Sequence, residues 1–179
     1  MRRYVALLRG INVGGRNKVA MADLREAFAI HGFAAVATYI QSGNVLFESA
    51  APPRSLEAAI EAMLAEELSI QIMVVVRSRD QMSSVVGHAP AGYGSQPDRY
   101  HSDAVFLKPP LTPAHLMTLV ELRDGVDRAW PGSGMVYFQR LSARRSQSRL
   151  SRIMGTSEYA NMTIRSWRTT LELLKRLEG

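Results

Sequence analysis

The residues best suited to chemistry lie in one glycine-rich stretch, "LLRGINVGGRNKV" at positions 7–19. Glycines can adopt positive φ angles, which lets neighbouring backbone N–H groups converge on an anion as a nest. Cationic side chains strengthen such a site, because a guanidinium group can hold a phosphate with two donors. The candidate phosphate-binding residues of the stretch are Arg9, Gly10, Asn12, Gly14, Gly15, Arg16 and Lys18. The alternative is a polar turn that needs glycine for its backbone and leaves its cations in water.

The stretch departs from the nucleotide-binding motifs whose mechanism is understood. Gly10 and Gly15 have the spacing of a P-loop, but Arg16 and Asn17 replace the required lysine and hydroxyl residue. Without that hydroxyl the usual Mg²⁺ ligand is missing, and the Rossmann glycine pattern fails at Asn12. We therefore exclude a nucleotide-hydrolysing P-loop and retain a looser anion-binding loop as the prediction.

A second polar cluster lies in the stretch "YIQSGNVLF", where two short strands flank a turn. The polar residues of this turn are Gln41, Ser42 and Asn44. In a ferredoxin-like half we expect the turn at the opposite end of the sheet from the glycine loop. The three side chains would then form a separate ligand-binding patch, the alternative being a hairpin turn that requires only Gly43.

A third cluster is the basic segment Arg140–Arg152, which holds five arginines and no acidic residue. We expect a helix over residues 147–154, in which Arg149 and Arg152 share one face. That face either contacts phosphate or is solvated, and the sequence leaves both interpretations open. The net charge of +6 favours phosphate partners, although 19 arginines against 3 lysines also fit a compositional bias.

Catalytic and metal-binding constellations are not recognisable. The chain has no cysteine, which excludes disulfides, thiolate nucleophiles and sulfur-ligated metals. Its histidines are dispersed without metal-ligand spacing, and there is no G-x-S-x-G nucleophile elbow. We assign no catalytic residue, metal or cofactor, and leave open whether the chain is an enzyme. His101 is the one histidine that we keep as a functional candidate.

The overall composition is that of a globular protein, with 46% hydrophobic and 21% charged residues in a chain of 179. No window approaches 18 consecutive apolar residues, so we expect no membrane-spanning helix. The short apolar run after Arg3 ends at Arg9, which is too short for a signal peptide. We therefore expect a cytoplasmic protein.

The elements that position the clusters follow from apolar periodicity. In the first half, strands are predicted at residues 3–9, 36–40, 45–47 and 70–76, and helices at residues 21–30 and after Pro53. This β-α-β-β-α-β order is the ferredoxin-like arrangement, with two helices on one face of an antiparallel sheet. Both faces of the 70–76 strand are apolar, so we expect the second face of this sheet to be covered too. A further helix follows a Ser78–Gln81 capping box.

The second half repeats this order. Strands are predicted from Ala104, at 126–130 and at 135–139, with helices after the Thr112 N-cap and at 147–154. A helix from about Ser166, with Trp167, Thr170, Leu171, Leu174 and Leu177 on one stripe, stands in place of a last strand. The fold class is thus α+β, with duplicated ferredoxin-like halves, antiparallel sheets and an extra C-terminal helix. We divide the chain into residues 1–86, a junction loop at 87–103, and residues 104–179.

Three stretches together resemble a known bacterial family, the domain of unknown function 1697. They are "YVALLRGINVGGRNKVAMADLREAF", "GFAAVATYIQSGNVLFES" and "MTIRSWRTTLELLKRL". The resemblance spans the whole chain and implies a free-standing cytosolic α+β protein. It implies no reaction, substrate or catalytic residue. It does group the glycine loop, the Gln41–Asn44 turn and Arg165–Arg168 before the last helix as the marked positions of the family.

We therefore predict a soluble phosphate-recognising module that binds a nucleotide or a nucleic-acid backbone. One alternative is an enzyme acting on a small anionic metabolite, with the 87–103 segment as a lid. Another is a protein–protein or self-association module that uses apolar sheet faces. The sequence does not decide between a monomer and a dimer, and it does not identify the ligand.

Overall fold

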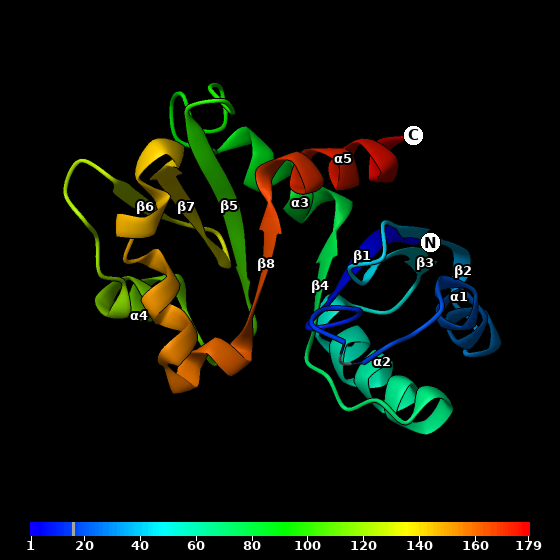
Figure 1. The fold of residues 1–179 in the computed structure, drawn as a ribbon. Helices are drawn as coiled ribbons and strands as arrows, with labels where there is room; N and C mark the ends of the chain where they lie inside the picture. Colours follow the sequence, from blue (N-terminus) through cyan, green and yellow to red (C-terminus); the bar gives the residue numbers. More distant parts are fainter. Residues whose placement is uncertain (16) are drawn as a thin grey trace. The chain divides into compact units, whose positions relative to one another are not determined.

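The described residues form two antiparallel sheets of four strands each. Figure 1 draws these strands together with the helices that pack on them. The computed structural model describes residues 1–15 and 17–179, which divide into two units. Unit 1 comprises Met1–Met82 and Leu173–Gly179, and unit 2 comprises Ser83–Glu172. The predicted α+β class with two antiparallel, ferredoxin-like halves is confirmed.

The sheet of unit 1 has the strand order β2-β3-β1-β4. Its strands are β1 (Arg2–Leu8), β2 (Ala34–Tyr39), β3 (Asn44–Ser49) and β4 (Val74–Ser78). Helices α1 (Met21–Ile30) and α2 (Pro53–Leu68) pack on one face through a continuous apolar core. Phe28 from α1 and Phe47 from β3 lie within that core, with ring centroids 5.5 Å apart. These helices and strands confirm the predicted order of elements in the first half.

The second face of this sheet is buried as well, as the apolar strand pattern predicts. Val5 and Leu7 of β1 and Val75 of β4 point away from the helix-covered face, and all three are fully buried. A residue on the opposite side of a strand from the core is buried only if another layer covers it. An open sheet that stacks nucleic-acid bases is therefore excluded for unit 1.

The sheet of unit 2 has the equivalent order β6-β7-β5-β8. Its strands are β5 (Tyr100–Leu107), β6 (Asp127–Gly132), β7 (Met135–Leu141) and β8 (Met162–Ser166), and α4 (Pro113–Leu119) follows β5. The Thr112 hydroxyl caps α4 by accepting from the His115 N–H, as predicted. Two expectations were wrong: β5 starts at Tyr100, inside the expected junction loop, and β8 supplies the last strand that the sequence pattern did not show.

The segment between β7 and β8 is not the predicted helix over residues 147–154. It forms three short 3₁₀ helices, η1 (Ser142–Gln147), η2 (Leu150–Gly155) and η3 (Ser157–Asn161). The Asp127 carboxylate accepts hydrogen bonds from the Ser148 hydroxyl and the Arg149 N–H, at 2.6 Å and 2.8 Å. These side-chain bonds compete with regular helix formation and fix the segment at its centre.

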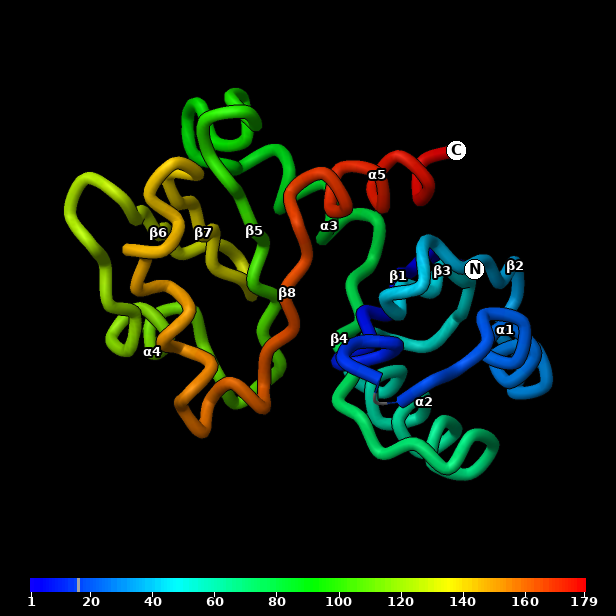
Figure 2. Tube along the Cα trace, in the orientation of Figure 1, coloured from blue at the N-terminus to red at the C-terminus, as the bar shows by residue number. Residues whose placement is uncertain are grey.

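The duplication extends beyond the strands. β4 ends in Arg77-Ser78 and runs directly into α3 (Arg79–Gly87). In the same way, β8 ends in Arg165-Ser166 and runs directly into α5 (Trp167–Glu178). Figure 2 traces the path of the chain from each strand into its helix. Both serines cap their helices, since the Ser78 hydroxyl accepts from the Gln81 N–H and the Ser166 hydroxyl accepts from the Thr169 N–H. The C-terminal helix is thus the repeat of α3 rather than an unrelated addition.

The apolar stripe of α5 differs from the prediction at one position. Thr170, Leu174 and Leu177 are buried as expected, but Leu171 is 42% exposed and Leu173 is fully buried in its place. The buried residues of α5 still recur at helical spacing and form one stripe, made of Trp167, Thr170, Leu173, Leu174 and Leu177. The prediction therefore misassigned only Leu171.

Candidate functional site

The glycine loop and the Gln41–Asn44 turn lie at the same end of the unit 1 sheet, not at opposite ends as predicted. In the register of β1 against β3, Leu7 pairs with Asn44. The Leu8 N–H donates to the Gly43 carbonyl at 2.8 Å. Because the two strands are antiparallel, the end of β1 meets the start of β3, and the segments beyond them must meet as well. Two of the three marked stretches therefore form one structural feature.

Asn12 locks this feature together. Its side-chain amide donates to the carbonyl oxygens of Val19 and Gln41, at 3.0 Å each, while its Oδ1 accepts from the Val19 N–H at 2.9 Å. The Asn17 side chain adds a bond of 3.2 Å to the Gly10 carbonyl. Asn12 thereby closes the glycine loop on itself and joins it to the turn. Both hydrogen bonds that the Asn12 side-chain amide donates go to backbone carbonyls, so the side chain serves the structure of the loop.

Gly43 and Asn44 also serve the fold. Gly43 has φ +74°, and a Cβ at this position would lie 2.9 Å from the Leu8 Cβ and 3.1 Å from the Ile11 Cβ. The buried Asn44 amide donates to the Tyr39 carbonyl and the Ser42 hydroxyl, at 3.1 Å each. Ile11, which is fully buried, fills the space beneath the turn. Of the predicted ligand residues in the turn, only Gln41 is exposed, and Ser42 is half-buried.

The outer part of the glycine loop is open to solvent. Gly10, Gly14 and Gly15 all have positive φ and are exposed, and a Cβ at Gly14 or Gly15 would meet nothing within 4 Å. These glycines are needed for backbone conformation rather than for close packing. Lys18 is exposed, and Arg9 is half-buried with its N–H bonded to the Met73 carbonyl. The predicted Arg16 lies outside the described residues.

Two exposed aliphatic residues accompany the loop, and sequence reasoning missed both. Val13 at the loop is 60% exposed, and Ile40 before the turn is 50% exposed. Ile40 also has φ 49°, a conformation that β-branched residues rarely adopt and that is often retained for function. The sequence signal that could have identified them is an isolated apolar residue in or beside each polar turn. We define the loop–hairpin surface as Val13, Gly14, Gly15, Lys18, Ile40 and Gln41.

Arg165 lies in unit 2, whereas the loop–hairpin surface lies in unit 1. Arg165 is on β8, and its guanidinium group donates to the Thr163 hydroxyl at 2.8 Å and the Ile164 carbonyl at 2.9 Å. Burial lowers the pKa of Arg165 to about 10. The side chain is only 8% exposed. These contacts hold the Arg165 side chain within unit 2. Its part in ligand binding stays a prediction.

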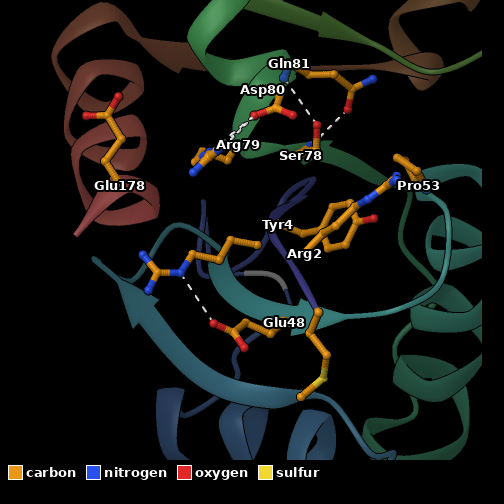
Figure 3. A pocket seen from close by; sticks show the side chains of 11 residues that line it. Arg2, Tyr4, Glu48, Pro53, Ser78, Arg79, Asp80, Gln81 and Glu178 are labelled. Atoms are coloured by element: carbon orange, nitrogen blue, oxygen red, sulfur yellow. Dashed lines mark hydrogen bonds and ion pairs between the residues drawn. The ribbon is translucent and has the colours of Figure 1, made fainter.

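The opposite end of the unit 1 sheet carries a polar depression of about 660 Å³, drawn in Figure 3. Four of its six charged side chains form ion pairs: Arg3 lies 3.4 Å from Glu48, and Arg79 lies 3.1 Å from Asp80. The Tyr4 hydroxyl donates to the Ala51 carbonyl. Because these groups satisfy each other, the depression is a weaker candidate for an anion than the loop–hairpin surface.

The 87–103 segment is fixed on the sheet of unit 2. Tyr93 is 7% exposed, and its hydroxyl donates to the Asp103 carbonyl at 2.6 Å and to the Phe138 carbonyl at 3.2 Å. Its ring packs edge-on against Trp167, with centroids 4.9 Å apart. Opening this segment as a lid would break both hydrogen bonds and expose the aromatic cluster.

The described residues contain no group of three or more His, Cys, Asp or Glu side chains arranged to hold a metal ion. None of their helices combines the length and apolar character needed to cross a membrane.

Comparisons with known proteins match the fold and the first two of the three marked stretches. A family model described as a protein of unknown function (DUF1697) matches residues 1–137, which contain the whole loop–hairpin surface. The solved structure of a conserved bacterial protein from Streptococcus pneumoniae is similar, with a TM-score of 0.85 and 27% identity. That likeness covers 100% of this chain and 99% of the other. Among curated proteins, no match to the chain is found.

Proposed function

This chain belongs to the DUF1697 family, and we propose that it is a phosphate-recognising module that binds a nucleotide or a nucleic-acid backbone. The loop–hairpin surface is the proposed binding site. The observation that carries the proposal is the contrast within one loop. Asn12 and Val19 are engaged in internal hydrogen bonds, whereas Gly14 and Gly15 are exposed at positive φ.

The hydrogen bonds of Asn12 support ligand binding because they fix the loop conformation before a ligand binds. A flexible glycine-rich loop loses much conformational entropy when a ligand orders it. Here Asn12 and Asn17 hold both ends of the loop, and the Asn12–Gln41 bond ties it to the sheet. The backbone N–H groups of these two exposed residues, Gly14 and Gly15, are proposed to meet an anion with little further ordering.

Charge and apolar contact supply the remaining interactions. Lys18 is exposed close in sequence to the glycines and acts as a mobile cation for a phosphate. Val13 and Ile40 offer aliphatic surface against which a sugar or base can pack. The net charge of +6 raises the local concentration of polyanions. We place the protein in the cytoplasm as part of this proposal, since nucleotides and nucleic acids are found there.

The proposal is tested by titrating the full chain with a short single-stranded RNA, a short duplex DNA and ATP at low salt. We expect saturable binding to at least one, with affinity falling steeply as salt rises. Lys18→Ala should weaken binding and lower the slope of log affinity against log salt by about one. Arg54→Ala, which removes an exposed cation from α2, is the matched control and should change neither. No binding to any of the three, or equal losses in both variants, would refute the proposal.

A second candidate function is association with a second copy of this chain through the same surface. Val13 and Ile40 favour it, because exposed aliphatic residues on an ordered edge are typical of interaction sites. This alternative predicts that a Val13→Ser, Ile40→Ser double variant loses association while salt has little effect. Light scattering of the wild type and the variant over a range of concentrations separates self-association from binding to phosphate.

A further inference from the structure

A depression of about 730 Å³ in unit 2 lies between the sheet and the arginine-rich 3₁₀ segment. It contains none of the residues of the loop–hairpin surface, so whatever it binds is independent of the proposed function. Its floor is apolar. Phe138 from β7 and Leu150 and Ile153 from η2 are each no more than 3% exposed. At its edge Met154 is 53% exposed and presents a flexible apolar side chain.

Arg140 gives the depression its charge. Its Nη2 donates to the Asp103 Oδ2 at 2.8 Å, and the side chain remains 17% exposed. Its Nε–H is buried without a hydrogen-bond partner in the part of the chain that the structure describes. Buried donors normally find an acceptor, so an arginine that lines a cavity with one donor unsatisfied has capacity for an anionic ligand.

Further donors line the same depression. Arg145 and the hydroxyls of Ser146 and Ser151 make no side-chain hydrogen bond within the described residues, whereas the Ser148 hydroxyl is committed to Asp127. Arg140 and Arg145 together outweigh the single carboxylate of Asp103. The depression thus combines an apolar floor, a net positive charge and hydroxyl donors on one segment.

The segment that carries these donors is held in place. Asp127 accepts from the Ser148 hydroxyl, from the Arg149 N–H and from the Arg123 N–H at 3.0 Å. Asp127 is only 6% exposed, which strengthens these charge-assisted bonds. The wall of the depression is therefore pre-formed, as in most small-molecule sites.

From this arrangement we propose that the depression binds a small amphipathic organic anion, with its acidic group toward Arg140 and Arg145 and its apolar body on the Phe138 floor. Guanidinium groups bind carboxylates and phosphates with the same paired geometry, so the shared chemistry is an oxyanion on a compact apolar group. The depression has room for a ring-sized body, since ligand cavities of several hundred Å³ hold small organic molecules.

The test is a titration of the isotope-labelled full chain with benzoate and, separately, with phenyl phosphate, followed by amide chemical shifts. We expect saturable shifts at Ser146, Ser151 and Ile153 with at least one probe, and the tighter probe identifies the acidic group. Benzyl alcohol, which lacks the charge, should bind at least about tenfold more weakly, as expected for the loss of a charge-assisted hydrogen bond.

Matched variants locate the site. Arg145→Gln should weaken binding of the tighter probe roughly tenfold. Arg144→Gln, which alters the adjacent exposed arginine that donates to Gln147 outside the depression, should leave it unchanged. Lys18→Ala should also leave it unchanged, which separates this site from the loop–hairpin surface. The proposal is overturned if neither anion gives saturable shifts at these amides, or if the Arg144 and Arg145 variants weaken binding equally.

Discussion

The side-chain amide of Asn12 donates to the backbone carbonyl of Gln41 at 3.0 Å across 29 residues of sequence. This bond joins the glycine loop to the β2–β3 turn and turns two marked stretches of sequence into one structural feature. It also divides the polar residues by role. Asn12, Asn17 and Asn44 hold the backbone, while Gly14, Gly15 and Lys18 face solvent.

Asn12→Ala should lower the free energy of unfolding by about 2–3 kcal/mol, because it leaves the Val19 and Gln41 groups without their partner. Asn17→Ala removes one exposed bond to Gly10 and should cost about 1 kcal/mol or less. Urea denaturation of both variants measures the difference. Equal stabilities of the two variants would show that the Asn12 side chain does not hold the glycine loop in place.

Gly43→Ala and Gly14→Ala separate crowding from backbone conformation. Both glycines have positive φ, but only at Gly43 does a Cβ collide with the Leu8 and Ile11 side chains. We expect a loss of about 3 kcal/mol or more for Gly43→Ala and about 1 kcal/mol for Gly14→Ala. Denaturation midpoints provide the comparison, and a Gly14 variant as unstable as the Gly43 variant would contradict it.

Ile40→Gly should leave the stability unchanged or raise it by up to about 1 kcal/mol, since glycine relieves the φ of 49° at a half-exposed position. Ile30→Gly, at an exposed position of α1, should instead cost about 1 kcal/mol. Thermal denaturation distinguishes the two. If Ile40→Gly also weakens nucleotide binding, Ile40 contributes to the binding surface.

Tyr93 should remain neutral in the folded protein at alkaline pH. Burial raises the pKa of its hydroxyl, with a further contribution from Asp103, and burial likewise raises the pKa of Tyr137. The folded pKa lies above the unfolded value of about 10, so this stabilisation is fully present below pH 10 and is lost as the pH rises above it. An absorbance titration should show fewer than the six tyrosines ionising before the chain unfolds.

Tyr93→Phe provides the matched variant for that titration. It should lower stability at neutral pH by about 1–3 kcal/mol, because the hydroxyl bonds to Asp103 and Phe138 are lost and their carbonyls stay buried. Stability of the variant should fall less steeply above pH 10 than that of the wild type. An unchanged slope would show that Tyr93 does not titrate with unfolding.

The sequence was most informative where one local rule decides the structure. The Ser78–Gln81 capping box and the Thr112 cap are present as predicted, and α1 has the predicted bounds. Local rules failed where distant groups decide. β8 contains only five residues and includes Arg165, so its strand character comes from pairing with β5.

The candidate site was predictable only in its composition. Glycines and cations at residues 9–18 indicate an anion-binding loop, but their spacing does not show which amide groups face inward. Strand register decides that the loop meets the Gln41–Asn44 turn, and register is a property of the assembled sheet. Val13 and Ile40 could be assigned to the surface only from the exposure of their side chains in the structure.

The central claim, that the loop–hairpin surface receives phosphate, is tested most directly by the backbone amide signals of Gly14 and Gly15. The isotope-labelled chain is titrated at low salt with ATP and with a short single-stranded RNA. We predict saturable shifts at these two amides and at Lys18 and Gln41, which reverse as salt is added. Unchanged signals at Gly14 and Gly15 while either ligand binds elsewhere, or no binding of either, would contradict the account.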